Sequence, residues 1–320
     1  MGNTVSPEEG TKEEKLLQMY NQTKAKQILT ICISCINTAV IYIIYMKYHL
    51  LITVYFLSLF GCLFFFLKND KKHFKEYITS SILSICFTYS IMTLLYSNYY
   101  FNLQYHLYII SLVIYHFAEY FFVLEYHFDL LSFKSFLIDQ SKEWILATSF
   151  SFVELIIENY FFHNVKVNLP FLLIGIIMMI IGHVFRIGAL FTGKQSFTHL
   201  ISTDKKEEHV LVTHGVYSIS RHPSYFGFFI WSVGGQVMCC SPLSIILFTV
   251  VLYKFFKGRI IYEEKFLILF FGEDYVEYRK KVPILIPGIS LDEDVVTYYL
   301  NRNKVTKKKN YENNNDDDYD

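Results

Sequence analysis

A run of His, Arg and Tyr side chains between apolar segments is the part of this chain best suited to chemistry. It starts with His209, Val210, Leu211 and Val212, includes Tyr217, and continues through residues 221–225, which read RHPSY. Polar groups buried in an apolar environment without partners are costly, so a cluster of this kind usually lines a site. We therefore expect these segments to form one pocket.

The RHPSY segment has the pattern of a loop that enters a helix. Proline is tolerated in the first turn of a helix and favours an extended conformation for the residue before it, here His222. This would place Arg221, His222 and Tyr225 next to backbone N–H groups that can bind a carboxylate or another acidic ligand edge. The simpler alternative is a helix start with Arg and Tyr at a membrane interface, but residues 209–212 and Tyr217 favour a site.

Arg259 and Glu263 form a second polar element. They are four residues apart, which places them on one face of a helix, and they directly follow an apolar run. A guanidinium group matches a carboxylate through two parallel hydrogen bonds, so Arg259 could hold a substrate acid while Glu263 meets a cationic group of a cofactor. An ordinary surface ion pair is the alternative interpretation.

Composition indicates the environment of this pocket. The chain of 320 residues is 53% hydrophobic and 18% aromatic, which is typical of a membrane protein with several spans. The formal net charge is zero, so no nucleic-acid partner is expected. We predict an all-α integral membrane protein with about eight transmembrane helices. The predicted spans are 28–46, 50–67, 77–96, 107–124, 144–161, 169–190, 224–238 and 242–256, with the last two joined as a tight hairpin.

Charge supports an even number of spans. Lysine and arginine concentrate in alternate loops, whereas only Lys47 and Lys166 fall in the opposite ones, and residues 97–106 carry neither. By the positive-inside rule both termini should be cytosolic. We divide the chain into a cytosolic N-terminal tail (1–26), transmembrane helices one to six (27–190), a catalytic region with the last hairpin (191–290) and a disordered cytosolic tail (291–320).

Metal and redox chemistry have little support in the sequence. The six cysteines lie mostly in apolar runs, and no His or acid stands near them at metal-ligand spacing, so we expect no metal site. Other ionisable residues inside predicted spans either pair between helices or contribute to function. They are His116, Glu119, Glu154, Glu158, His183 and Arg186.

The sequence HVLVTHGVYSISRHPSYFGFFIWSVGGQVM, followed by GRIIYEEKFLILFFGEDYVEYRKKVP, resembles the catalytic region of the isoprenylcysteine carboxyl methyltransferases. The resemblance implies a pocket for S-adenosyl-L-methionine at the cytosolic edge of the membrane. It makes Arg259 the residue that binds the substrate carboxylate, and Arg259 and Glu263 the catalytic pair. The cofactor contacts that it implies are His209, Val210, Leu211, Val212, Tyr217, His222, Pro223, Ser224, Tyr225 and Glu263. Ser202 stands where the animal enzymes typically have a cofactor-contacting Gln.

The resemblance also implies a reaction and a location. The substrates would be prenylated CaaX proteins such as small GTPases, in the endoplasmic reticulum membrane. A prenylcysteine carboxylate has a pKa near 3.5 and is already ionised, so orientation and desolvation, rather than a general base, are the task of the enzyme. A phospholipid N-methyltransferase and a sterol-reductase-like NADPH enzyme, both with related RHPxYxG elements, are the alternatives; a transporter has no internal repeat in its favour.

Overall fold

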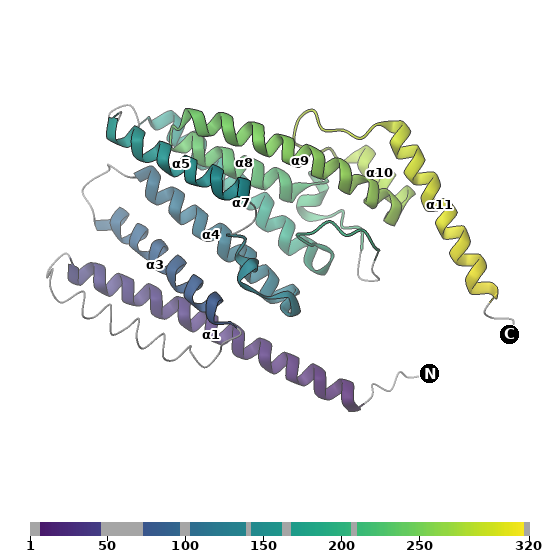
Figure 1. Ribbon diagram of the computed structural model, residues 1–320, viewed down its shortest axis with the longest axis horizontal. Coiled ribbons are helices and arrows are strands. Elements are labelled where there is room, and N and C mark those ends of the chain that lie inside the picture. The colour runs from purple at the N-terminus through teal and green to yellow at the C-terminus, as the bar shows by residue number, and fades with distance from the viewer. Residues whose placement is uncertain are drawn as a thin grey trace. The chain divides into compact units, whose positions relative to one another are not determined.

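Figure 1 shows the computed structural model, which describes residues 7–45, 73–96, 103–138, 142–161, 168–205 and 210–316. Every regular element within these ranges is a helix. The chain divides into two compact units, Met1–Ser141 and Lys142–Asp320. Each unit is described by itself.

Within its described residues, the first unit has three long helices. They are α1 (Pro7–Tyr45), α3 (Phe74–Tyr96) and α4 (Leu103–Tyr126), followed by the short helices η2 (Phe128–Leu130) and η3 (Phe133–Phe136). Buried Gln27 of α1 joins all three: its amide donates to the Tyr120 hydroxyl (2.8 Å) and accepts from Ser80 (2.7 Å). A buried amide satisfied on both sides fixes the register of the three helices, because leaving either group unpaired would be costly.

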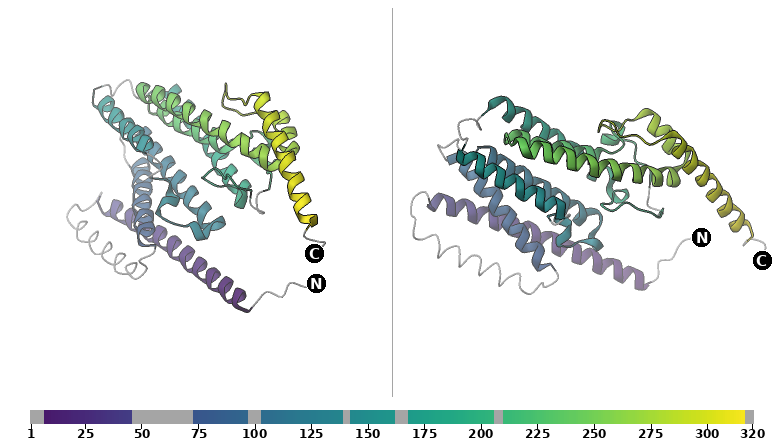
Figure 2. Two further views of the ribbon diagram at one scale, coloured as in Figure 1. Left: turned by 45° about the vertical axis from the view of Figure 1, so that its right-hand side comes forward. Right: turned by 45° about the horizontal axis from the view of Figure 1, so that its top comes forward.

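The second unit carries the segments in which the sequence predicts a site. Its helices are α5 (Lys142–Phe161), α7 (Leu169–Gly193), α8 (Pro223–Met238), α9 (Pro242–Phe271), α10 (Glu273–Lys281) and α11 (Glu293–Asp316), with the short helices η4 (Lys194–Ser196) and η5 (Gly215–Ser218) between α7 and α8. The views in Figure 2 show α7, α8 and α9 side by side, with α10 and α11 at the end of α9.

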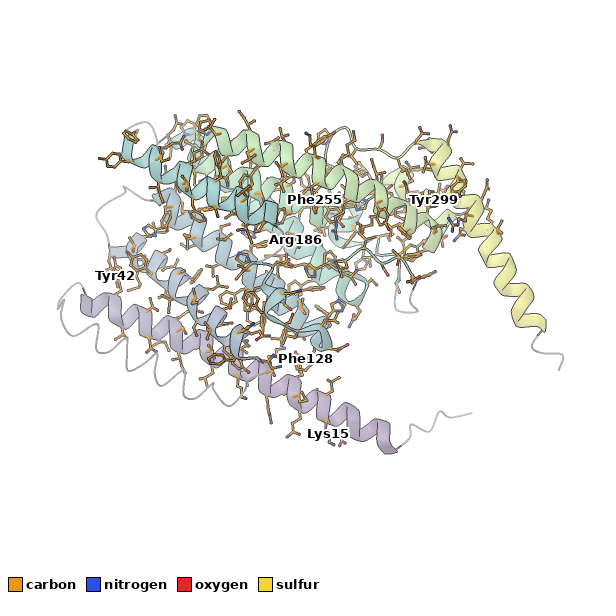
Figure 3. The ribbon with its side chains drawn as sticks, viewed as in Figure 1. Lys15, Tyr42, Phe128, Arg186, Phe255 and Tyr299 are labelled. Carbon is orange, nitrogen blue, oxygen red and sulfur yellow. The ribbon has the colours of Figure 1, made fainter. Side chains whose placement is uncertain are left out.

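Helices α7 and α8 approach each other through glycines. A Cβ atom on Gly182 would lie 2.5 Å from the Trp231 Cβ and 2.7 Å from the Gly227 carbonyl oxygen. These distances are too short for any larger residue unless the helices separate. The close approach also lets buried Arg186 of α7, labelled in Figure 3, donate to the Ser224 hydroxyl at the start of α8 (2.5 Å).

A carboxylate from α5 fixes the beginning of α9. Buried Glu154 accepts hydrogen bonds from the backbone N–H groups of Leu243 (2.9 Å) and Ser244 (2.8 Å), and also from the Ser244 hydroxyl. The first N–H groups of a helix have no intrahelical partner, so a carboxylate there both satisfies them and complements the helix dipole. Glu158 accepts from Ser241 in the same region (3.2 Å). Glu154 and Glu158 therefore pair between helices rather than contributing to the predicted pocket.

The helices compare closely with the predicted spans. Six predicted spans lie within described helices, the span 28–46 follows α1 as far as Tyr45, and the span 50–67 lies outside the described residues. Among the described helices, those covering Phe74–Tyr96, Leu103–Tyr126 and Leu169–Ser196 are long and apolar enough to cross a bilayer. Helix α8 ends at Met238 and α9 starts at Pro242, which confirms the tight hairpin.

Two elements differ from the prediction. Helix α9 continues past the apolar run to Phe271, so Arg259 and Glu263 stand on a direct extension of the last span. The segment 291–320, predicted to be disordered, contains α11, which is helical through Asp316. The prediction failed because Leu291 and Val296 are buried against Ile268 and Tyr275. The tail is polar on average, so its composition did not indicate this apolar contact.

Candidate functional site

A cavity lies where α8, α9 and α10 meet the segment between α7 and α8. The cavity is partly open to solvent. The wall combines apolar side chains with a few polar ones. The lining residues most relevant to chemistry are Ser202, Val210, Leu211, Val212, Tyr217, Arg221, His222, Pro223, Ser224, Tyr225, Glu263 and Tyr275.

Every residue that was predicted to contact the cofactor and that lies within the described ranges lines this cavity. Val210, Leu211 and Val212 come from the loop before η5, and the backbone N–H of Val210 donates to the Ser196 hydroxyl (3.3 Å). Ser202 lines the cavity, but its hydroxyl donates to the carbonyl of Asp204 in its own loop (2.8 Å). His209 lies outside the described residues. Residues of the segment 210–225 and Glu263 therefore line one cavity, whereas Arg259 does not line it.

The start of α8 matches the prediction for Pro223 but not for His222, which was expected to be extended and instead has φ −123° and ψ 59°. Pro223 is the first helical residue and His222 precedes it as the N-cap. The Tyr225 ring stacks on one side against His222 (centroids 5.6 Å apart, planes within 9°) and on another against Phe256 of α9 (5.2 Å). These contacts hold the Tyr225 hydroxyl between α8 and α9.

Arg259, Tyr225 and Glu263 form a continuous polar chain. Arg259 Nε donates to the Tyr225 hydroxyl (2.9 Å), and that hydroxyl donates to Glu263 Oε2 (2.5 Å). The Arg259 guanidinium also donates to the His199 carbonyl and lies 5.5 Å from the Tyr225 ring centroid. Arg259 is not itself part of the cavity wall, but these bonds attach it to two residues that are, Tyr225 and Glu263.

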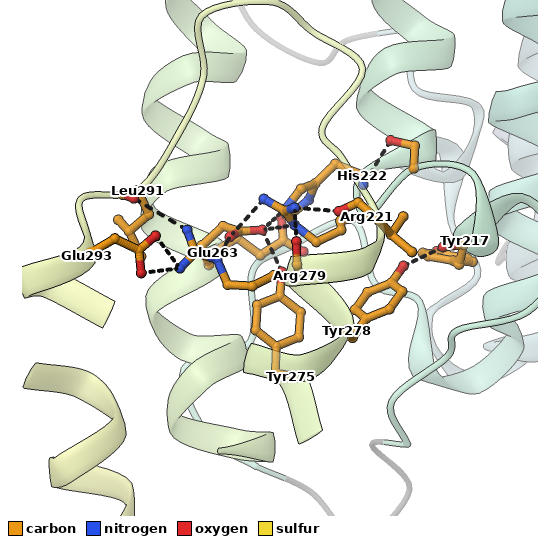
Figure 4. A network of polar contacts seen from close by, with 12 residues as sticks. Tyr217, Arg221, His222, Glu263, Tyr275, Tyr278, Arg279, Leu291 and Glu293 are labelled. Carbon is orange, nitrogen blue, oxygen red and sulfur yellow. Dashed lines mark hydrogen bonds and ion pairs between the residues drawn. The ribbon is translucent and has the colours of Figure 1, made fainter. Parts of the chain in front are cut away.

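Glu264, the residue after Glu263, belongs to a second polar cluster. Figure 4 shows its partners Arg221, His222, Tyr275 and Arg279. Its side chain is 1% exposed. Its Oε1 accepts from Arg221 Nε (3.1 Å), His222 Nε2 (2.8 Å) and the Tyr275 hydroxyl (2.5 Å). Arg221 Nη2 reaches Oε2 (3.4 Å), and Arg279 Nε lies 3.8 Å from the same oxygen. Adjacent acids on α9 thus serve two clusters, one at the cavity and one behind it.

Arg221 ties this cluster to α10 and the chain that follows. Its Nη1 donates to the carbonyls of Arg279 (3.0 Å) and Val282 (2.5 Å), and its backbone N–H donates to the Pro283 carbonyl (3.1 Å). Arg221 is almost fully buried, with a side chain 7% exposed. A guanidinium in that position needs several acceptors, and the network supplies them.

The electrostatics of the cluster favour an ionised Glu264. Burial alone would raise the pKa of this carboxyl group, but the hydrogen bond and charge of His222, the charge of Arg221 and the Tyr275 hydroxyl outweigh it and lower the pKa to about 2. The pKa of Tyr275 is raised by burial and by the charge of Glu264, so its hydroxyl stays protonated as a donor. Burial likewise raises the pKa of Tyr217.

Comparison with known proteins gives the family. The family model described as "Isoprenylcysteine carboxyl methyltransferase (ICMT) family" matches residues 174–269. A Saccharomyces cerevisiae protein-S-isoprenylcysteine O-methyltransferase is 39% identical over 192 residues, covering 58% of this chain and 80% of the relative. The chain belongs to the isoprenylcysteine carboxyl methyltransferase family.

Other relatives agree with this assignment. The Arabidopsis thaliana protein-S-isoprenylcysteine O-methyltransferase B is 49% identical over 150 residues, covering 47% of this chain and 76% of the relative. The solved structure of a eukaryotic intramembrane Ras methyltransferase, an isoprenylcysteine carboxyl methyltransferase, has a TM-score of 0.76 at 31% identity and covers 83% of this chain and 97% of that one. The all-helical architecture is therefore that of a membrane fold of this family.

Two residues at the site had no role in the sequence analysis. Glu264 was visible only as the second acid of a pair, and Tyr275 only as a member of the segment FFGEDYVEYRKKVP. A signal for Glu264 did exist, because two adjacent residues on a helix point about 100° apart, so both acids cannot face the same cavity. Nothing in the spacing identifies its partners Arg221 and Tyr275, which come from other parts of the chain.

Proposed function

We propose that this protein is a protein-S-isoprenylcysteine O-methyltransferase that methylates the C-terminal prenylcysteine carboxylate of CaaX-processed proteins, such as small GTPases, with S-adenosylmethionine. The observation that carries the proposal is the chain from Arg259 through Tyr225 to Glu263. It joins a cation suited to an acid acceptor to a carboxylate that lines the cavity.

The cavity suits the methyl donor. Val210, Leu211, Val212, Phe266 and Leu267 give it an apolar wall against which an adenine ring can pack. The Glu263 side chain is 27% exposed and supplies a negative charge for the amino group or sulfonium of S-adenosylmethionine. Once bound, S-adenosylmethionine supplies an electrophilic methyl group that needs no metal for its activation.

Arg259 has the geometry to bind and orient the acceptor. Its guanidinium is held by Tyr225 and by the His199 carbonyl. A carboxylate is a stronger acceptor than a neutral carbonyl, so an acceptor acid can take over the bond to His199 while Tyr225 keeps its own. Because the acceptor acid is already ionised, the remaining work of the site is to exclude water and hold two opposite charges in line.

The same residues argue against the main alternative. A phospholipid N-methyltransferase acts on an amine, and the Arg259 cation would repel a protonated amine held in the place of the carboxylate. The acid acceptor therefore fits the charge of this part of the site better.

We further propose that the chain has eight membrane spans with cytosolic termini, resides in the endoplasmic reticulum membrane, and has its catalytic region at residues 191–290.

A methyl-transfer assay tests this function. The full-length protein in detergent or lipid vesicles is incubated with radiolabelled S-adenosylmethionine and either N-acetyl-S-farnesylcysteine or phosphatidylethanolamine. We expect base-labile label, released as volatile methanol, with the first acceptor only. Base-stable label in phosphatidylethanolamine, or no transfer to either acceptor while NADPH binds, would contradict the proposal.

A further inference from the structure

Two adjacent acids on α9 have separate surroundings. Glu263 lines the cavity and receives the Tyr225 hydroxyl, whereas Glu264 is 1% exposed and faces away from the cavity. Glu264 is not part of the cavity wall, although three of the residues bonded to it or close to it, Arg221, His222 and Tyr275, are. Glu264 therefore contacts the site from behind.

His222 lies between the two acids. Its Nε2 is 2.8 Å from Glu264 Oε1, and its Nδ1 is 3.9 Å from Glu263 Oε2. The hydrogen bond at Nε2 fixes the plane of the His222 imidazole. Because the Tyr225 ring stacks parallel to this imidazole, its orientation is constrained as well. The position of the Tyr225 hydroxyl between Arg259 and Glu263 thus depends on the carboxylate of Glu264.

Glu264 also binds Tyr275, a residue of α10 that lines the cavity. The Tyr275 hydroxyl of α10 donates to the oxygen that receives His222, so one carboxylate oxygen joins α8, α9 and α10. Its charge is balanced by Arg221 and by Arg279 at 3.8 Å. A buried ion pair that loses one partner is strongly destabilised, because the remaining charge has no compensation.

We propose that Glu264 is a positioning residue for the methyl-donor site, which holds His222, Arg221 and Tyr275 in the arrangement that the cavity requires. The proposal rests on the proposed function, since it assumes that the cavity binds S-adenosylmethionine. Glu264 itself touches neither substrate. It acts on the cavity through the side chains that line it.

The charge-neutral variant Glu264→Gln tests this role. An amide keeps the volume but cannot accept from all three donors, and it leaves Arg221 and Arg279 without their shared countercharge. We expect the dissociation constant for S-adenosylmethionine, measured by equilibrium binding, to rise at least tenfold. The KM for N-acetyl-S-farnesylcysteine should rise by a smaller factor, because Glu264 acts on the acceptor side only through the stack of His222 on Tyr225. Glu264→Asp, which keeps the charge, should recover part of the donor affinity.

Two matched controls separate positioning from general stability. Glu154 is also a buried carboxylate with several donors, but it binds the first turn of α9, whereas Glu264 lies near the other end of that helix. Glu154→Gln should lower the melting temperature and leave the donor affinity of the folded protein unchanged. Exposed Glu293 pairs with Arg279 on its outer side (3.1 Å), and Glu293→Gln should leave both quantities at wild-type values.

Measurements of donor affinity in these variants can overturn the positioning role of Glu264. Wild-type donor affinity in folded Glu264→Gln, or an equal loss in Glu154→Gln, overturns the positioning role. If Glu264→Gln does not fold, Tyr275→Phe replaces it, because it deletes only one hydroxyl donor to Glu264; unchanged donor affinity in that variant also overturns the proposal. Failure of the proposed function is seen separately, as a wild-type protein that forms no base-labile methyl ester.

Discussion

The Tyr225 hydroxyl is the link between the donor and acceptor halves of the site, and Tyr225→Phe removes it without disturbing its surroundings. The hydroxyl accepts from Arg259 Nε (2.9 Å) and donates to Glu263 (2.5 Å). The ring contacts with His222 and Phe256 do not involve the hydroxyl and remain in the variant. We therefore expect the variant to fold, with a melting temperature lowered only by the loss of these two hydrogen bonds.

The magnitude follows from the charges of the two partners. A hydrogen bond to a charged group contributes about 1.5–3 kcal/mol, and the variant leaves Arg259 and Glu263 each without one. A loss of about 1.4 kcal/mol corresponds to a factor of ten in rate, so kcat/KM should fall by about tenfold to a hundredfold. Both the donor and the acceptor should be affected, because the hydroxyl contacts residues of both halves.

The assay for Tyr225→Phe is release of base-labile methanol, with the concentrations of S-adenosylmethionine and N-acetyl-S-farnesylcysteine varied in turn. The matched control is Tyr253→Phe, which removes a hydroxyl of the same helical hairpin that donates to the Gly288 carbonyl (3.4 Å) and does not line the cavity. The control should keep wild-type kinetics. If Tyr225→Phe changes kcat/KM by less than twofold for both substrates, the polar chain is not part of the reaction.

Four further predictions concern charge, packing and pH. Arg259→Lys keeps the charge but loses the planar fork, so acceptor kcat/KM should fall at least tenfold, about 1.4 kcal/mol, with donor binding nearly unchanged; the reverse pattern would mean that the two halves are interchanged. Glu263→Ala should abolish measurable S-adenosylmethionine binding while the protein remains in the membrane, and unchanged affinity would remove Glu263 from the site. Gly182→Ala should destabilise the protein by about 1–3 kcal/mol in thermal unfolding, since its Cβ meets backbone atoms, whereas Gly258→Ala meets nothing within 4 Å and should be neutral or stabilising. The pKa of Glu264 is lowered to about 2 in the folded protein from the ordinary value of 4.5, so its stabilising contribution is present above pH 4.5 and is lost as pH falls towards 2. In thermal unfolding, the wild type should therefore lose more stability between pH 4.5 and 2 than Glu264→Gln. Parallel curves of stability against pH for the two proteins would contradict this prediction.

The parts of the fold that the sequence predicted are those that depend on local pattern. Apolar runs of membrane length gave the helices, and Pro223 marked the first residue of α8. The extension of α9 to Phe271 was harder to predict, because its last half carries Arg259, Glu263 and Glu264 and no longer looks like a span. This half of α9 is helical because its other faces line the cavity and pack against α10 and α11.

The candidate site divides in the same way. Residue types and spacing were enough to assemble the cavity wall from Val210 to Tyr225 and Glu263, which the structure places together. The partners of Glu264 come from residues 42 or 43 positions before it and from Tyr275 on the next helix. Such contacts depend on how α8, α9 and α10 pack, and spacing along the chain does not encode them.

A structure of the full-length protein with S-adenosylhomocysteine and N-acetyl-S-farnesylcysteine would show directly whether the cavity binds the methyl donor and Arg259 the acceptor. We expect S-adenosylhomocysteine to occupy the cavity lined by Val210, Val212 and Glu263, with its sulfur facing the acceptor. The acceptor carboxylate should be within hydrogen-bonding distance of the Arg259 guanidinium. Density for S-adenosylhomocysteine away from this cavity, or an acceptor carboxylate bound by a residue other than Arg259, would contradict the account.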